Sequence, residues 1–191
     1  MKILFLDFDG VITTYETGWT ISLDKLALVD RIINETGARI VVTSSWKHGY
    51  SNVDGFKNSI CNKRCSRTIK EETPFEKFIG QIYDITSGCG YRGEEVERWL
   101  EEHEDDVETY AILDDDSDFK KEQLFNFIQT DTYEGLTERE TKMAISILNN
   151  KKIPNPIRLN LELTTMWRNR CSGLDKDNGI DEMLKEYYNR F

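Results

Sequence analysis

Residues 2–10, KILFLDFDG, form a short apolar run that ends in two aspartates and a glycine. A short run of this kind predicts a buried β-strand. Because successive strand side chains alternate between the two faces, carboxylates two residues apart, Asp7 and Asp9, can face one cavity at the end of the strand. Gly10 allows the chain to turn sharply afterwards. The stretch therefore predicts a strand that delivers a pair of carboxylates to one site.

The residues that follow extend this strand into a βαβ unit. Ser22 is a candidate cap for a helix over residues 23–36, in which apolar residues recur at helical spacing, and Gly37 is a natural end for that helix. Residues 38–43, ARIVVT, form a second apolar strand. Strand, helix and strand within about forty residues predict a parallel sheet with a right-handed crossover.

The alternation of strands and helices continues along the chain. The further elements expected are a short helix after Pro74, strands over 81–86, 107–113 and about 125–130, a helix from near Gly93, and a helix to Leu148 that Thr137 caps together with Glu140. The expected fold class is therefore α/β, a Rossmann-like three-layer sandwich around a central parallel sheet.

The predicted catalytic domain covers residues 1–149, and residues 150–191 form a C-terminal extension. Only one helix fits between the first two strands, so we expect no large cap there. The polar stretch 44–72 is expected to be irregular, and it is the candidate for a small lid. A role for residues 150–191 in oligomer assembly is an open alternative.

Length and composition restrict the class of protein. The chain has 191 residues, 38% of them hydrophobic, which suits one domain with a small appendage and excludes wholesale disorder. No apolar run approaches the roughly 20 residues that a membrane span needs. The N-terminus does not resemble a signal peptide, so we expect a cytoplasmic protein with no membrane partner. The cysteines are then expected to be free thiols, and their spacings match no common zinc site; they are Cys61, Cys65, Cys89 and Cys171.

The net charge of −10 argues against a protein that grips a long stretch of nucleic acid non-specifically. It does not exclude one nucleic-acid end held at a metal centre. The charge is also uneven, because residues 57–70 carry five basic residues and no acid, whereas residues 94–108 are strongly acidic. We expect three residues of the basic segment to bind further phosphates of a substrate: Lys63, Arg64 and Arg67.

Polar residues follow the predicted strands at their carboxyl ends, where open α/β sheets bind ligands. These residues are Asp7 and Asp9, Thr43 and Ser44, and Asp114 and Asp115. One carboxylate can act as a nucleophile and a second as general acid and base. Hard oxygen ligands suit Mg²⁺. A threonine hydroxyl can bind a phosphate oxygen, and Arg92 can offset developing negative charge.

Four segments resemble the motifs of the haloacid dehalogenase superfamily of phosphohydrolases: FLDFDGV, RIVVTSS, the helix start at Arg92, and AILDDDSD. The resemblance covers residues 1 to about 149. More narrowly, the segments TSSW, RGEEVERWL, ILDDDSDF and QTDTYEGLT look like the small phosphatase-like domains found with RNA-repair proteins and in phage-type genomes.

This resemblance implies a role for each carboxylate. Asp7 would be the nucleophile, and Asp9 would protonate the leaving oxygen and then activate water. Asp114 would ligate Mg²⁺ together with Asp7 and the backbone carbonyl of Asp9. Asp115 would ligate through water or orient the others, and Asp118 is a further candidate. The acid at Asp9 favours a phosphatase or phosphotransferase, because the dehalogenase branch lacks it.

The resemblance also implies that Thr43 binds the transferred phosphate, with Ser44 beside it. Arg92 would occupy the position where the family usually has lysine, and Lys70 and Lys77 are the alternatives for this cation. Trp46 and Tyr50 are open between stacking on a base and packing in the core. His48 is more simply a surface residue, and His103 is expected to pack on its helix.

The sequence thus predicts a Mg²⁺-dependent phosphomonoester hydrolase with a phosphoaspartyl intermediate. Its expected substrate is a nucleotide or a nucleic-acid-end phosphate. A phosphatase of a phosphoprotein or a small metabolite is one alternative, and a non-catalytic module that binds a nucleotide or phosphate is another.

Overall fold

The computed structural model describes residues 1–64, 74–88 and 90–149. In chain order, the helices and strands are β1 (Lys2–Leu6), α1 (Leu23–Thr36), β2 (Arg39–Val42), η1 (Ser45–Lys47), α2 (Val53–Arg64), α3 (Pro74–Gln81), β3 (Ile82–Ile85), α4 (Arg92–Glu102), β4 (Thr109–Asp114), η2 (Lys121–Gln123), β5 (Phe127–Gln129) and α5 (Glu138–Leu148). The predicted extension 150–191 lies outside the described residues.

The five strands form one parallel sheet in the order β3-β2-β1-β4-β5, with β1 in the centre. The chain runs outward from β1 through β2 to β3 and then returns to the other side of β1 as β4 and β5. The strand order therefore reverses between β1 and β4. In open α/β sheets, this reversal leaves a crevice at the carboxyl ends of the two strands.

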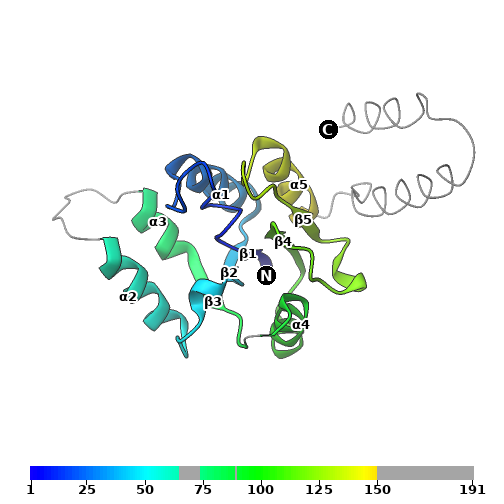
Figure 1. The fold of residues 1–191 in the computed structure, drawn as a ribbon. Coiled ribbons are helices and arrows are strands. Elements are labelled where there is room, and N and C mark those ends of the chain that lie inside the picture. Colours follow the sequence, from blue (N-terminus) through cyan, green and yellow to red (C-terminus); the bar gives the residue numbers. More distant parts are fainter. Residues whose placement is uncertain (65–73, 89, 150–191) are drawn as a thin grey trace, which may run out of the picture. The chain divides into compact units, whose positions relative to one another are not determined.

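Helices cover both faces of the sheet, as Figure 1 shows with α1 and α5 on one side and α4 on the other. Leu4 and Leu6 of β1 belong to the main core cluster, to which α1, α3 and α5 also contribute. Phe5 points to the opposite face, where its ring meets Trp99 of α4 edge-on at 5.4 Å between centroids. The predicted three-layer α/β fold is thus confirmed, and α1 is the only helix between β1 and β2.

The prediction of an irregular stretch over residues 44–72 was wrong in part, because residues 53–64 form helix α2. Phe56 and Ile60, one helical turn apart, are buried in the core cluster. Asn52 accepts a hydrogen bond from the Gly55 N–H at 2.8 Å, which caps the start of the helix. Val53, Phe56 and Ile60 recur at helical spacing, but the polar, glycine-containing segment around them obscured this pattern. The proposed lid stays a prediction, because residues 65–73 lie outside the described part of the chain.

Within the described residues, no helix is both long and apolar enough to span a membrane.

Candidate active site

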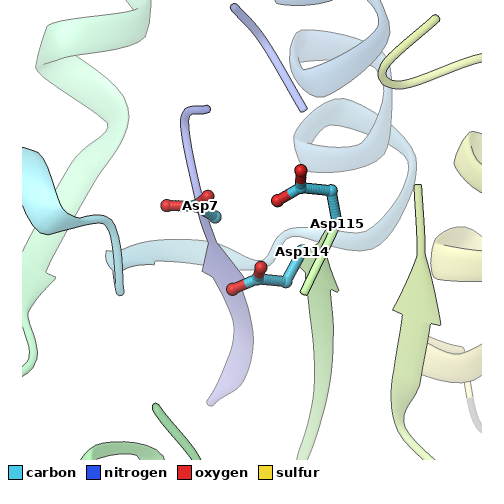
Figure 2. A group of neighbouring side chains, drawn as sticks. All are labelled: Asp7, Asp114 and Asp115. Carbon is cyan, nitrogen blue, oxygen red and sulfur yellow. The ribbon is translucent and has the colours of Figure 1, made fainter. Parts of the chain in front are cut away.

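The central polar residues of the site lie side by side because the strands are paired in register. Leu6 is level with Val42 of β2 and with Leu113 of β4. The next residue along the chain is Asp7 after β1, Thr43 after β2 and Asp114 at the end of β4. The Asp7 N–H donates to the Leu113 carbonyl, and the Thr43 N–H donates to the Leu6 carbonyl, each at 3.0 Å. Figure 2 shows Asp7 at the end of β1 beside Asp114 and Asp115 at the end of β4.

The turn after Asp7 requires glycine at position 10. The Phe8 carbonyl accepts hydrogen bonds from three consecutive backbone N–H groups, those of residues 11–13, and this closes the turn. Gly10 has φ +70°, and a Cβ placed there would lie 2.2 Å from the Asp115 carboxyl carbon. The absence of a side chain at Gly10 therefore lets the carboxylate of Asp115 approach this turn.

Both carboxylate oxygens of Asp9 are held by hydrogen bonds. The Thr13 hydroxyl donates to Oδ1 at 2.7 Å, and the Trp46 indole N–H donates to Oδ2 at 2.9 Å. The Trp46 ring also packs edge-on against Phe8, with 5.5 Å between centroids. The sequence is compatible with base stacking or core packing of Trp46, and its contact with Asp9 was not predicted. Its position directly after TSS, at the end of β2, was the available indication that it lies near the site.

Arg92 reaches the carboxylates from the first turn of α4. Its Nη1 donates to Asp7 Oδ1 at 2.9 Å and to the Thr43 carbonyl at 3.0 Å, and it lies 3.4 Å from Asp114 Oδ2. Asp118 Oδ2 accepts from the Arg92 backbone N–H at 3.2 Å and so caps the start of α4. The alternative cation Lys77 instead pairs with Asp30 of α1 at 2.7 Å.

Three carboxylates could hold a metal ion. Asp7, Asp114 and Asp115 each offer one oxygen, and these oxygens lie within 4.8 Å of one another. Buried atoms without a hydrogen-bond partner among the described residues include Asp7 Oδ2, Asp114 Oδ2 and the Thr43 hydroxyl oxygen. Unpartnered buried carboxylate oxygens are costly. A hard divalent cation such as Mg²⁺ would satisfy them, so the residues present fit this ion.

When no metal ion is bound, the electrostatics of the site favour the protonated form of its carboxylic acids. Burial raises the pKa of Asp7, although the Arg92 guanidinium opposes this. Burial, together with the negative charge of Asp7, raises the pKa of Asp114 to about 8. Ionising both carboxylates in one buried site therefore costs considerable free energy, and a bound divalent cation would offset that cost.

We expect the stability of the metal-free protein to fall as pH rises from about 4 to about 8. In this window folded Asp114 retains a proton that the unfolded chain has released, because its pKa is raised from 3.8 to about 8. The unfolded state then binds fewer protons than the folded state, so the free energy of unfolding declines with pH. Mg²⁺ competes with this proton and should stabilise the fold more at about pH 8 than at about pH 5.

Urea unfolding at both pH values, in EDTA and in Mg²⁺, measures this dependence. The Asp114→Asn variant is the control, and its decline with pH should be smaller. A metal-free protein whose stability rises over the same window would contradict the proposed ionisation of the site.

A buried ion pair behind the site was not predicted. Lys47 Nζ lies 2.8 Å from Glu95 Oε2, and the two side chains are 3% and 4% exposed. The Thr86 hydroxyl donates to the same Glu95 oxygen at 3.1 Å, and Lys47 Nζ lies 3.4 Å from the Thr43 carbonyl. The pair therefore ties the segment after β2 to α4 and to the end of β3. The two residues are far apart in a sequence rich in charges, so no local pattern links them.

The remaining candidates are placed as follows. Ser44 is buried, and its hydroxyl accepts from the Trp46 backbone N–H. Tyr50 and His48 line a cavity of about 450 Å³ between residues 47–53 and 84–88.

His103 stacks on Trp99, which confirms its predicted packing role. The side chains of Lys63, Arg64, Arg67 and Lys70 and of the four cysteines lie outside the described part of the chain.

A family model described as "HAD domain in Swiss Army Knife RNA repair proteins" matches residues 3–141. The matched range runs from β1 into α5 and includes every residue of the site described above. Searches of curated proteins and of solved structures each found no match.

Proposed function

The chain belongs to the family of HAD domains in Swiss Army Knife RNA repair proteins, and on this premise we propose that it is a Mg²⁺-dependent phosphomonoester hydrolase. At the general level, the HAD domain indicates a hydrolase of the phosphatase type. One observation carries the finer proposal: a buried Asp7 with a free Oδ2 stands in register between Thr43 and Asp114 and contacts Arg92.

In the proposed reaction, Asp7 attacks the phosphorus, and the bond from phosphorus to the leaving oxygen breaks. Asp9 donates the proton that the leaving oxygen needs. Asp9 then takes a proton from a water molecule, whose oxygen attacks the phosphoaspartate and releases inorganic phosphate. Arg92 and the Thr43 hydroxyl stabilise the negative charge of the transferred group. Mg²⁺, when bound, would neutralise charge on the phosphate and on the carboxylates.

The substrate that we propose is the phosphate at a nucleic-acid end or on a nucleotide. The family description associates this domain with RNA repair. The segment between β1 and β2 holds only α1 and turns. It therefore forms no large cap that would exclude a polynucleotide end. The net charge of −10 disfavours long non-specific contacts and is compatible with recognition of a single end.

A substrate panel tests the proposal. It comprises nucleoside monophosphates, 3′- and 5′-phosphorylated oligonucleotides, sugar phosphates and phosphopeptides, each assayed with Mg²⁺ and with EDTA. We expect phosphate release that EDTA abolishes and that is fastest for an oligonucleotide end or a nucleotide. Preference for a phosphopeptide or a sugar phosphate would favour those alternatives, and binding without release would favour a non-catalytic module.

We expect Trp46→Phe to lower kcat/KM on substrates with a poor leaving group. The variant retains an aromatic ring against Phe8 but removes the N–H that holds Asp9. A hydrogen bond to a charged group contributes about 1.5–3 kcal/mol, so its complete loss in the transition state would slow the reaction about 10- to 150-fold.

Comparing an alkyl phosphate with 4-nitrophenyl phosphate separates a positioning role from a general structural one. The ratio kcat/KM reports the first step, transfer of the phosphoryl group to Asp7. The aryl leaving group hardly needs a proton in that step, so its kcat/KM should change little, whereas the kcat/KM of the alkyl phosphate should fall. An equal loss of kcat/KM on both substrates would contradict a specific role through Asp9 in this step.

A further inference from the structure

Two exposed tyrosines from distant parts of the sequence lie against each other. The rings of Tyr15 and Tyr133 have centroids 5.2 Å apart and an interplanar angle of 49°. Their exposed fractions are 64% and 63%. A single exposed aromatic residue is ordinary, whereas an exposed pair concentrates apolar surface at one place. We call these two residues the tyrosine pair.

The tyrosine pair is connected to both groups of acids in the site. Tyr15 follows Thr13 by two residues, and the Thr13 hydroxyl donates to Asp9. Tyr133 directly follows Thr132, whose hydroxyl donates to Asp115 Oδ2 at 2.7 Å. The two segments whose threonine hydroxyls donate to Asp9 and Asp115 therefore also carry the tyrosine pair.

The two segments are fastened to each other near the pair. The Leu136 N–H donates to the Val11 carbonyl at 2.9 Å, and the Thr130 hydroxyl donates to the Gly10 carbonyl at 2.8 Å. Gly135 has φ +72°, and a Cβ there would lie 2.5 Å from Thr14 Cγ2. A surface held in this way loses little conformational freedom when a ligand binds, which favours affinity.

We propose that the tyrosine pair is a stacking platform for the base next to the scissile phosphate. This inference rests on the proposed function, and it names a part of the substrate that the catalytic residues do not contact. Aromatic side chains stack on any base, so the platform would be tolerant of sequence. It would also bind a nucleic-acid end without positive charge, as suits a chain with net charge −10.

The test compares substrates that differ only in the base. The kcat/KM of a nucleoside 5′-monophosphate is divided by that of ribose 5-phosphate, and the same ratio is taken for 3′-phosphorylated oligonucleotides with a terminal base or a terminal abasic site. For Tyr133→Ala and for Tyr15→Ala, we expect at least one of these ratios to fall about 5- to 150-fold, through KM. Tyr133→Phe retains the ring and should keep the wild-type ratio.

Phe125→Ala is the matched control. Phe125 is 59% exposed and precedes β5, at the opposite end of the strands from the acids, so its loss should change neither ratio. Alanine variants of the pair that keep both wild-type ratios would overturn the proposal, as would equal losses on substrates with and without the base.

A binding measurement distinguishes failure of the platform from failure of the proposed reaction. The affinity of the wild type and of the tyrosine variants for the two oligonucleotides is measured in Ca²⁺ by fluorescence anisotropy. If the wild type hydrolyses none of the substrates, the proposed function fails, and the platform still predicts tighter binding of the oligonucleotide with a terminal base. Equal affinities for the two oligonucleotides would then refute the platform as well.

Discussion

Asp7→Asn is expected to reduce turnover to the background of the assay. An amide cannot form the acyl phosphate, and it is a poor ligand for Mg²⁺. The fold should survive, because asparagine has nearly the same size and can still accept the hydrogen bond that Arg92 donates to Oδ1. Steady-state assays with substrate in excess, together with circular dichroism, measure the two effects.

Asp9→Asn is the matched comparison for this result. It replaces the predicted acid and base but leaves the nucleophile in place, so turnover should fall by about 10²- to 10⁴-fold and remain detectable. An Asp7→Asn protein, purified away from host phosphatases, that retains as much activity as Asp9→Asn would show that the nucleophile has been misassigned.

Glu95→Gln is expected to destabilise the fold by about 3–5 kcal/mol, because it leaves Lys47 buried without a countercharge. Lys47 is 3% exposed, so water cannot replace the lost carboxylate. Lys47→Met should destabilise the fold by a similar amount, because it leaves Glu95 buried without a countercharge. The double variant Lys47→Met/Glu95→Gln should be less destabilised than the sum of the two single changes, since it leaves no unpaired charge.

Chemical denaturation of the four proteins gives the coupling energy directly. Glu35→Gln is the control, because Glu35 pairs with Arg31 on the exposed surface of α1, and its loss should cost at most about 1 kcal/mol. Equal costs for Glu95→Gln and Glu35→Gln would contradict a structural role for the buried pair.

The part of the fold that could be predicted from the sequence is the part with local, repeated patterns. The apolar run ending in Asp7 identifies β1, and helix α1 was predicted over the residues where it occurs. The Thr137 and Glu140 side chains form the capping box expected at the start of α5. Because parallel strands end at one edge of the sheet, the same reasoning brought Asp7, Thr43 and Asp114 together.

The features that were missed depend on contacts between residues far apart in the sequence. The place of Trp46 directly after TSS put it near the strand ends but did not show that its N–H meets Asp9. The pairing of Lys47 with Glu95 arises only when α4 packs against the sheet. Arg92 was predicted at the site. It lies there because the start of α4 closely approaches the chain after β4. A Cβ at Gly93 would lie 2.9 Å from the Lys120 backbone nitrogen, so only glycine allows this approach.

Mass spectrometry of the protein quenched in acid during turnover tests most directly whether Asp7 carries the phosphoryl group. The Asp9→Asn variant is used with 4-nitrophenyl phosphate. This leaving group hardly needs a proton, so the intermediate still forms, and its slow hydrolysis favours its accumulation. Borohydride reduction before digestion converts an acyl phosphate to the alcohol and so marks the residue that carried it. We predict one added phosphoryl group in the intact protein, and homoserine at position 7 after reduction. Turnover with no covalent phosphate on the protein, or with the modification at another residue, would contradict the account.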